Sequence, residues 1–172
     1  ARDLGLPVRT VIDTNEVGAS IEDRARAFSE ADVILLYQPI GDAPINNIRG
    51  VQSIIPSKRD DSWKWPPTII VETDDNLFNV SPLNPAFGGL GIRDLSGNDI
   101  PEGHHIGIVE NGERRIMFKD GEGGFSIARN RQALASYRKI LEMVDAVSCS
   151  TSGVEDSVLK EAKPARTRVW PN

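Results

Sequence analysis

The sequence predicts an α/β domain with a Rossmann-like, doubly wound, mostly parallel sheet and a β-hairpin insertion. Short β-branched runs alternate along the chain with segments of helical periodicity, which is the pattern of parallel strands joined by crossover helices. The strongest run is 68–71, where four β-branched residues follow two prolines and precede a group of acids. Such an uninterrupted apolar run is typical of a buried parallel strand. We expect residues 1–172 to form one domain, because this length suits a single core.

The first half of the chain alternates strand, helix, strand, helix and strand. These elements are expected at 8–12, 20–30, 32–37, 42–55 and 68–71. The strand segments are apolar and β-branched, whereas Ile45, Ile48 and Ile55 recur at helical spacing in the segment 42–55. A polar connector at 57–67 leads into the strongest strand.

The second half begins with a loop at 80–103 that is rich in proline and glycine. Two apolar runs around Asn111-Gly112 then predict a β-hairpin. The clearest helix begins at Ser126, a strand follows at 145–149, and Ser152 with Glu155 predicts the start of a short helix. The last strand is expected at 167–170, and Cys149 is expected in the core.

Composition excludes several classes of protein. The net charge of −5 argues against a chain held on nucleic acid by bulk charge, although a local basic groove remains possible. Among partners, we consider nucleic acid only as a possible acceptor of a transferred group. A single cysteine excludes an internal disulfide and fits a reducing compartment, for which we expect the cytoplasm. No apolar run approaches the roughly 20 residues of a membrane span.

Three acids at the end of the strongest strand are the main candidates for chemistry. Glu72, Asp74 and Asp75 could act as a general base, bind sugar hydroxyls or hold a divalent cation. Their position favours a function, because open α/β sheets bind ligands beyond the carboxyl ends of their strands. The alternative is that Asp74 or Asp75 caps a turn beginning at Asn76, which would make these acids structural.

Further candidates follow other strands. Gln38 lies on the same expected rim as the acids, and Thr151 lies in a run of three hydroxyl residues after the strand at 145–149. His104 and His105 are the only histidines, and adjacent residues point to opposite faces, so they do not suit one shared metal. Either one could contact substrate or could be an ordinary surface residue. We expect no metal site.

Four segments resemble, in the same order, the N-terminal domain of two-domain, GT-B-type glycosyltransferases. The stretch Ile70-Val71-Glu72-Thr73-Asp74-Asp75-Asn76-Leu77-Phe78 is similar to an E-x-D-D-D/N-L-[FW] motif of retaining glycosyltransferase-like proteins, many of them bacterial or from phages. The segment 31–39, ending in Gln38-Pro39, resembles the strand that precedes this motif. The segment 144–151 and the ending Val169-Trp170-Pro171-Asn172 resemble the last part of that domain.

This resemblance implies that the chain is the acceptor-side half of an enzyme that moves a sugar from a nucleotide-sugar donor. The donor would bind to a C-terminal domain, so we expect this chain to be inactive alone. Compared with the pattern of this family, we also expect the chain to lack the first strand of the domain. The residues implicated in catalysis are Glu72, Asp74 and Asp75, and those implicated in substrate binding are Gln38, His104, His105 and Thr151. A non-catalytic α/β binding or interaction module is the alternative, and a metal-dependent transferase using Glu72 and Asp74 is a third hypothesis.

Overall fold

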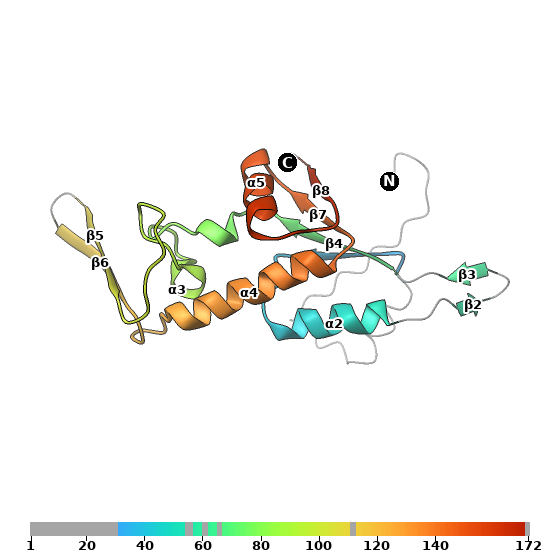
Figure 1. Cartoon of the computed structure of the whole chain (residues 1–172), viewed down its shortest axis with the longest axis horizontal. Helices are drawn as coiled ribbons and strands as arrows, with labels where there is room; N and C mark the ends of the chain where they lie inside the picture. The colour runs from blue at the N-terminus through green and yellow to red at the C-terminus, as the bar shows by residue number, and fades with distance from the viewer. Residues whose placement is uncertain (1–30, 54–56, 60–61, 65–66, 111–112, 171–172) are drawn as a thin grey trace.

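The computed structural model describes residues 31–53, 57–59, 62–64, 67–110 and 113–170. The strand expected at 8–12 and the helix expected at 20–30 lie outside the described residues. The remaining elements build a central parallel sheet with helices packed on it and a separate β-hairpin at one end (Figure 1).

The central sheet has four parallel strands in the order β1-β4-β7-β8. Their bounds are Val33–Tyr37, Thr68–Thr73, Ala146–Cys149 and Thr167–Val169. The helices between them are α2 (Asp42–Gln52), α4 (Ile127–Met143) and α5 (Ser152–Glu161). The predicted α/β class with a mostly parallel sheet and a hairpin insertion is therefore confirmed.

One face of the sheet carries the main core. Ile34 pairs with Ile69, and Val71 pairs with Val147, so the inward residues of neighbouring strands form continuous apolar rows. Residues of all three helices pack on these rows in one cluster that includes Ile48, Ile140 and Val158. The helix predicted to begin at Ser126 is α4, and its apolar residues from Ile127 to Leu141 that recur at helical spacing are buried.

The alternate face of β1 is open to solvent. Val33, Leu35 and Tyr37 are 56%, 59% and 61% exposed, because the described helices all pack on the other side of the sheet. Within the described part of the chain, the helices therefore cover only one face of the sheet.

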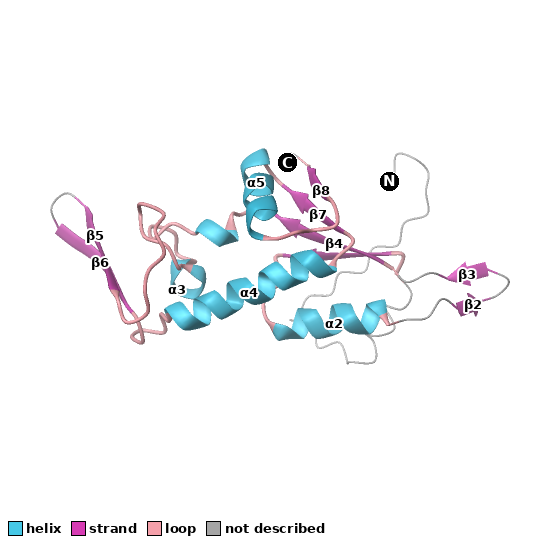
Figure 2. Cartoon of the chain, viewed as in Figure 1, coloured by secondary structure: helices cyan, strands magenta, loops and turns pink. Residues whose placement is uncertain are grey.

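A second, smaller core lies between the central sheet and the hairpin. The hairpin strands β5 (His105–Glu110) and β6 (Glu113–Lys119) are antiparallel, as predicted. They pack beside the short helix α3 (Phe87–Leu90), with Phe87, Phe125 and Ile127 fully or almost fully buried. Figure 2 shows this hairpin at one end of the molecule, beyond the first turn of α4.

Three expectations differ from the structure. The connector at 57–67 contains a short antiparallel pair, β2 (Ser57–Arg59) and β3 (Ser62–Lys64), whose three-residue strands are too short to show periodicity. The helix α5 is capped by Thr151 and not by Ser152, because the Thr151 hydroxyl accepts from the backbone N–H of Val154 at 3.2 Å. Glu72 lies inside β4 and not after it.

Candidate functional site

The polar residues at the carboxyl ends of β1, β4 and β7 meet around one residue, Asp74. Asp74 accepts a hydrogen bond from the Tyr37 hydroxyl at 2.8 Å and another from the Gln38 side-chain amide at 2.5 Å. Each carboxylate oxygen holds one of these donors, so the Asp74 side chain is oriented from both sides. The structure thus brings together two of the predicted site residues, Gln38 and Asp74.

The strand register explains why these side chains meet. Tyr37 is the last residue of β1 and pairs with Glu72 of β4, which places the next residues of both strands side by side. The backbone N–H of Gln38 donates to the Glu72 carbonyl at 3.0 Å and extends this ladder by one residue. On the β7 side, the Ser150 hydroxyl donates to the Asp74 carbonyl at 2.9 Å.

Gln38 has a strained backbone. Its φ of 39° is positive, and within the described ranges it is the one non-glycine residue with this property. The left-handed region costs a non-glycine residue of order 1 kcal/mol, so other interactions must hold it there. The side-chain bond to Asp74 and the backbone bond to Glu72 supply that support.

Negative charge surrounds the Tyr37 hydroxyl. Its hydrogen bond to Asp74 raises the pKa of Tyr37 above the usual value, and loss of solvent and the charges of Asp74, Asp75 and Glu72 raise it further. All three predicted acids therefore act on the same point of the sheet edge. Such an edge can accept hydrogen bonds from several hydroxyl groups of a ligand at once.

The capping hypothesis is wrong for Asp74. The 3-10 turn η2 (Leu77–Asn79) begins after Asn76 and has no side-chain cap. The Asp74 carboxylate instead bonds across the sheet to residues of the β1 end. The Asn76 side chain is used differently, because its carbonyl oxygen accepts from Ser157 of α5 at 2.7 Å.

The other predicted site residues divide into two groups. Thr151 lies on the same edge, where its hydroxyl oxygen caps α5 and its proton bonds to none of the residues that the structure describes. His104 and His105 lie apart from the acids, and their predicted contact with substrate stays a prediction. His105 belongs to β5 and pairs with Lys119, and His104 directly precedes that strand, at the end of the molecule away from the central sheet (Figure 1).

Sequence reasoning missed two aromatic residues at this edge. The sequence places Tyr37 only in a strand, and Trp170 only in the last expected strand and the ending motif. Trp170 is 66% exposed beyond the end of β8, its backbone N–H donates to the Cys149 carbonyl, and Arg168 lies 5.9 Å from its ring centre. An aromatic residue at the last position of a strand, beside an acidic strand end, is the signal that could have indicated Tyr37.

Directly beneath the edge lie neutral groups. The Tyr137 phenol is buried beside Thr73, with no hydrogen bond formed to any described residue. Burial raises the pKa of Tyr137 to about 12 and that of the Cys149 thiol to about 11. Both groups are therefore uncharged at neutral pH, and the charge of the site is confined to its exposed surface.

Neither a metal cluster nor a membrane span is found in the part of the chain that the structure describes. No group of three histidine, cysteine or acidic residues there has metal-binding spacing. No described helix is both long and apolar enough to cross a bilayer.

Comparison with known proteins adds no family. No family model matches the chain, and neither a curated protein nor a solved structure matches it. The functional argument therefore depends on the residues and geometry described above.

Proposed function

We propose that this chain is the acceptor-side domain of a GT-B-type glycosyltransferase. The observation that carries the proposal is the Asp74 carboxylate, exposed at the carboxyl edge of a parallel sheet and held there by Tyr37 and Gln38. Ligands of open α/β sheets bind at this edge. A carboxylate fixed in orientation is suited to accept hydrogen bonds from the hydroxyl groups of an acceptor.

Each residue of the edge has a separate role in this proposal. Asp74 accepts a hydrogen bond from the acceptor hydroxyl, and Glu72 and Asp75 add negative charge around it. Tyr37 and Gln38 position the Asp74 carboxylate. Thr151 donates its free hydroxyl proton to the acceptor. The histidines take no part, because they lie on the hairpin.

The proposal requires a second domain that holds the nucleotide-sugar donor. Such domains stabilise the leaving diphosphate with basic side chains and helix N-termini, so the proposed reaction needs no metal held by this chain. We place the protein in the cytoplasm, in accord with the single buried free thiol of Cys149.

Calorimetry and transfer assays test the proposal together. The 172-residue chain should show no tight binding of nucleotide sugars, whereas a longer gene product that includes the donor domain should transfer a sugar. Asp74→Asn should reduce kcat/KM of that product by about 10- to 100-fold, the effect of losing a charged hydrogen bond. Asp94→Asn is the control, because the Asp94 carboxylate bonds to Ser96 and Asn98 of its own loop and not to residues of the edge. Micromolar donor binding by the 172 residues would overturn the acceptor-side assignment.

A carbohydrate-binding module without catalysis is the second candidate. The exposed rings of Tyr37 and Trp170 favour it, because they lie on the outer strands of the sheet with Asp74 between them. Aromatic faces stack on apolar faces of sugars, and a carboxylate between them can bind the hydroxyls. Sugar binding by the full-length protein without any transfer would favour this candidate.

A further inference from the structure

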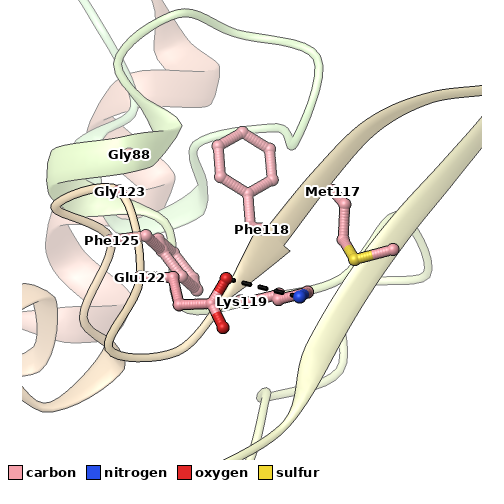
Figure 3. Close-up of a pocket in the computed structure, with 7 residues that line it drawn as sticks. All are labelled: Gly88, Met117, Phe118, Lys119, Glu122, Gly123 and Phe125. Carbon is pink, nitrogen blue, oxygen red and sulfur yellow. Dashed lines mark ion pairs between the residues drawn. The ribbon is translucent and has the colours of Figure 1, made fainter.

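A cavity of about 320 Å³ lies between α3, β6 and the glycine-rich turn that follows β6 (Figure 3). It is separate from the sheet edge, at the hairpin end of the molecule. Its lining comes from seven residues: Gly88, Met117, Phe118, Lys119, Glu122, Gly123 and Phe125. The volume lies in the range of small-molecule sites.

The apolar wall of the cavity is fixed by aromatic packing. The rings of Phe118 and Phe125 lie 5.3 Å apart between centres, and Phe118 lies 4.8 Å from the buried ring of Phe87. Phe125 is only 4% exposed. A wall held in this way offers an apolar ring a preformed surface, so binding requires little ordering of the protein.

Gly88 of α3 lines the cavity and has open space where a side chain would begin. This residue is half-buried, yet a Cβ atom added to it would meet nothing within 4 Å. Its backbone is helical, so a side chain there is not strained. Gly88 therefore combines a place in the cavity lining with open space at its Cβ.

An ion pair closes one side of the cavity, and its two members are held differently. The Lys119 ammonium lies 3.3 Å from the Glu122 carboxylate (Figure 3). Lys119 belongs to β6 and pairs with His105 across the hairpin. Glu122 lies on a turn with glycines of positive φ on both sides, and its side chain is 66% exposed against 41% for Lys119. The carboxylate is therefore the partner that a ligand can replace.

We propose that this cavity binds a small carboxylic acid that carries an aromatic or alicyclic ring. The ring packs on Phe118 and Phe125, and the carboxylate takes the place of Glu122 beside the Lys119 ammonium. Among the described residues, the two cations near this turn, Lys119 and Arg129, have one carboxylate partner between them, Glu122. The Arg129 guanidinium bonds to the neutral Gly124 carbonyl, and the Asp120 carboxylate is occupied by the backbone N–H groups of Gly103 and Ile127. An anion therefore finds more free partners than a cation does.

Two neighbouring glycines give a matched test. 3-Phenylpropionate is titrated into the ¹⁵N-labelled 172-residue chain, with an expected dissociation constant on the order of 1 mM for a ligand of this size. Gly88→Leu fills the cavity and should abolish the shifts of the Lys119 and Phe125 amides. Gly89→Leu, in the same helix with free space at its Cβ but outside the lining, should bind as the wild type does. Equal binding by both variants would overturn the proposal.

Charge variants test the chemical class of the ligand. Lys119→Met should weaken 3-phenylpropionate binding about two- to fivefold, which is the loss in affinity expected when a solvent-exposed ion pair is removed. Glu122→Gln should strengthen the binding, because the ligand carboxylate no longer competes with a charged side chain. 3-Phenylpropylamine has the same shape with the opposite charge and should bind more weakly than the acid. If the amine binds more tightly and Glu122→Gln weakens its binding, the cavity selects cations and the proposal is wrong.

Discussion

At the carboxyl end of β4, the orientation of one side chain depends on two residues of the neighbouring strand. Asp74 is held by the Tyr37 hydroxyl and the Gln38 amide, and Gln38 is itself held in a left-handed conformation. Strained residues and oriented charges of this kind are typical of ligand sites, because a structural turn gains nothing from them. This arrangement is the strongest argument that the edge binds a ligand.

Titration of tyrosine tests the bond between Tyr37 and Asp74. The chain has two tyrosines, so Tyr137→Phe leaves Tyr37 as the only ionising phenol. In that background its pKa should lie above 10, because the phenolate would face the Asp74 carboxylate. Adding Asp74→Asn should lower the pKa towards 10, and adding Asp94→Asn should leave it unchanged. Absorbance at 295 nm between pH 8 and about 12 measures both values. No difference between the two variants would contradict the bond.

Replacement of Gln38 separates stability from binding. Gln38→Gly removes the strain of a positive φ but adds the flexibility of glycine to the unfolded chain, and these effects are of similar size. The free energy of unfolding should therefore change by no more than about 0.5 kcal/mol in urea titrations. Ligand binding at the edge should weaken, because Asp74 loses one of its two donors. A large loss of stability would show that Gln38 is mainly structural.

The buried neutral groups predict a loss of stability at alkaline pH. The pKa of Cys149 is raised from 9.0 to about 11 and that of Tyr137 from 10.0 to about 12, so folding favours their protonated forms. Their contribution is complete below pH 9 and is lost as the pH rises towards 12. The double variant Cys149→Ala, Tyr137→Phe should lose less stability over this interval than the wild type. Parallel curves in urea titrations from pH 8 upwards would contradict this account.

Among the elements, α5 is joined to α4 and to the loop after α3 by the ion pairs of one carboxylate. Glu161, at the end of α5, forms ion pairs with Arg93, in the loop between α3 and β5, at 2.9 Å and with Arg138 of α4 at 3.0 Å. Arg93 also donates to the Phe78 carbonyl beside η2. These bonds hold the loop between α3 and β5 against the main core.

Glu161→Gln should lower the free energy of unfolding by about 1–2 kcal/mol, because two guanidinium groups lose a charged partner. Asp156→Asn, on an exposed face of α5, is the control. The hydrogen bond from Arg93 lowers the pKa of Glu161 below its usual value. Its contribution is therefore present above pH 4.5 and is lost as the pH falls below that value, so wild type and variant should converge in acid. A constant difference down to pH 3 would contradict this role.

The regular elements were predictable because their physical signals are local. The apolar runs of β1, β4 and β7 and the buried stripe of α4 can be read directly from the order of residues. The bond between Tyr37 and Asp74 could not, because it requires that β1 lie beside β4 in the register that pairs Tyr37 with Glu72. The separation of the histidines from the acids likewise depends on where the hairpin packs, which no local pattern specifies.

In the whole molecule, the two proposed sites lie in different places. The four parallel strands present Asp74 and its neighbours at one edge, and the hairpin with α3 forms a cavity of different chemistry elsewhere (Figures 1 and 3). The polar edge suits hydroxyl-rich ligands, and the cavity suits a ring with one charge. Ligands of the two sites should therefore not compete.

Chemical-shift mapping tests whether the edge around Asp74 binds the acceptor. The ¹⁵N-labelled chain is titrated with a series of methyl glycosides and short oligosaccharides. We expect added sugar to change the chemical shifts of the backbone amides of Gln38, Asp74 and Ser150. These changes should disappear in Asp74→Asn and persist in Asp94→Asn. Sugar binding that maps to another surface, or that Asp74→Asn leaves unchanged, would contradict it.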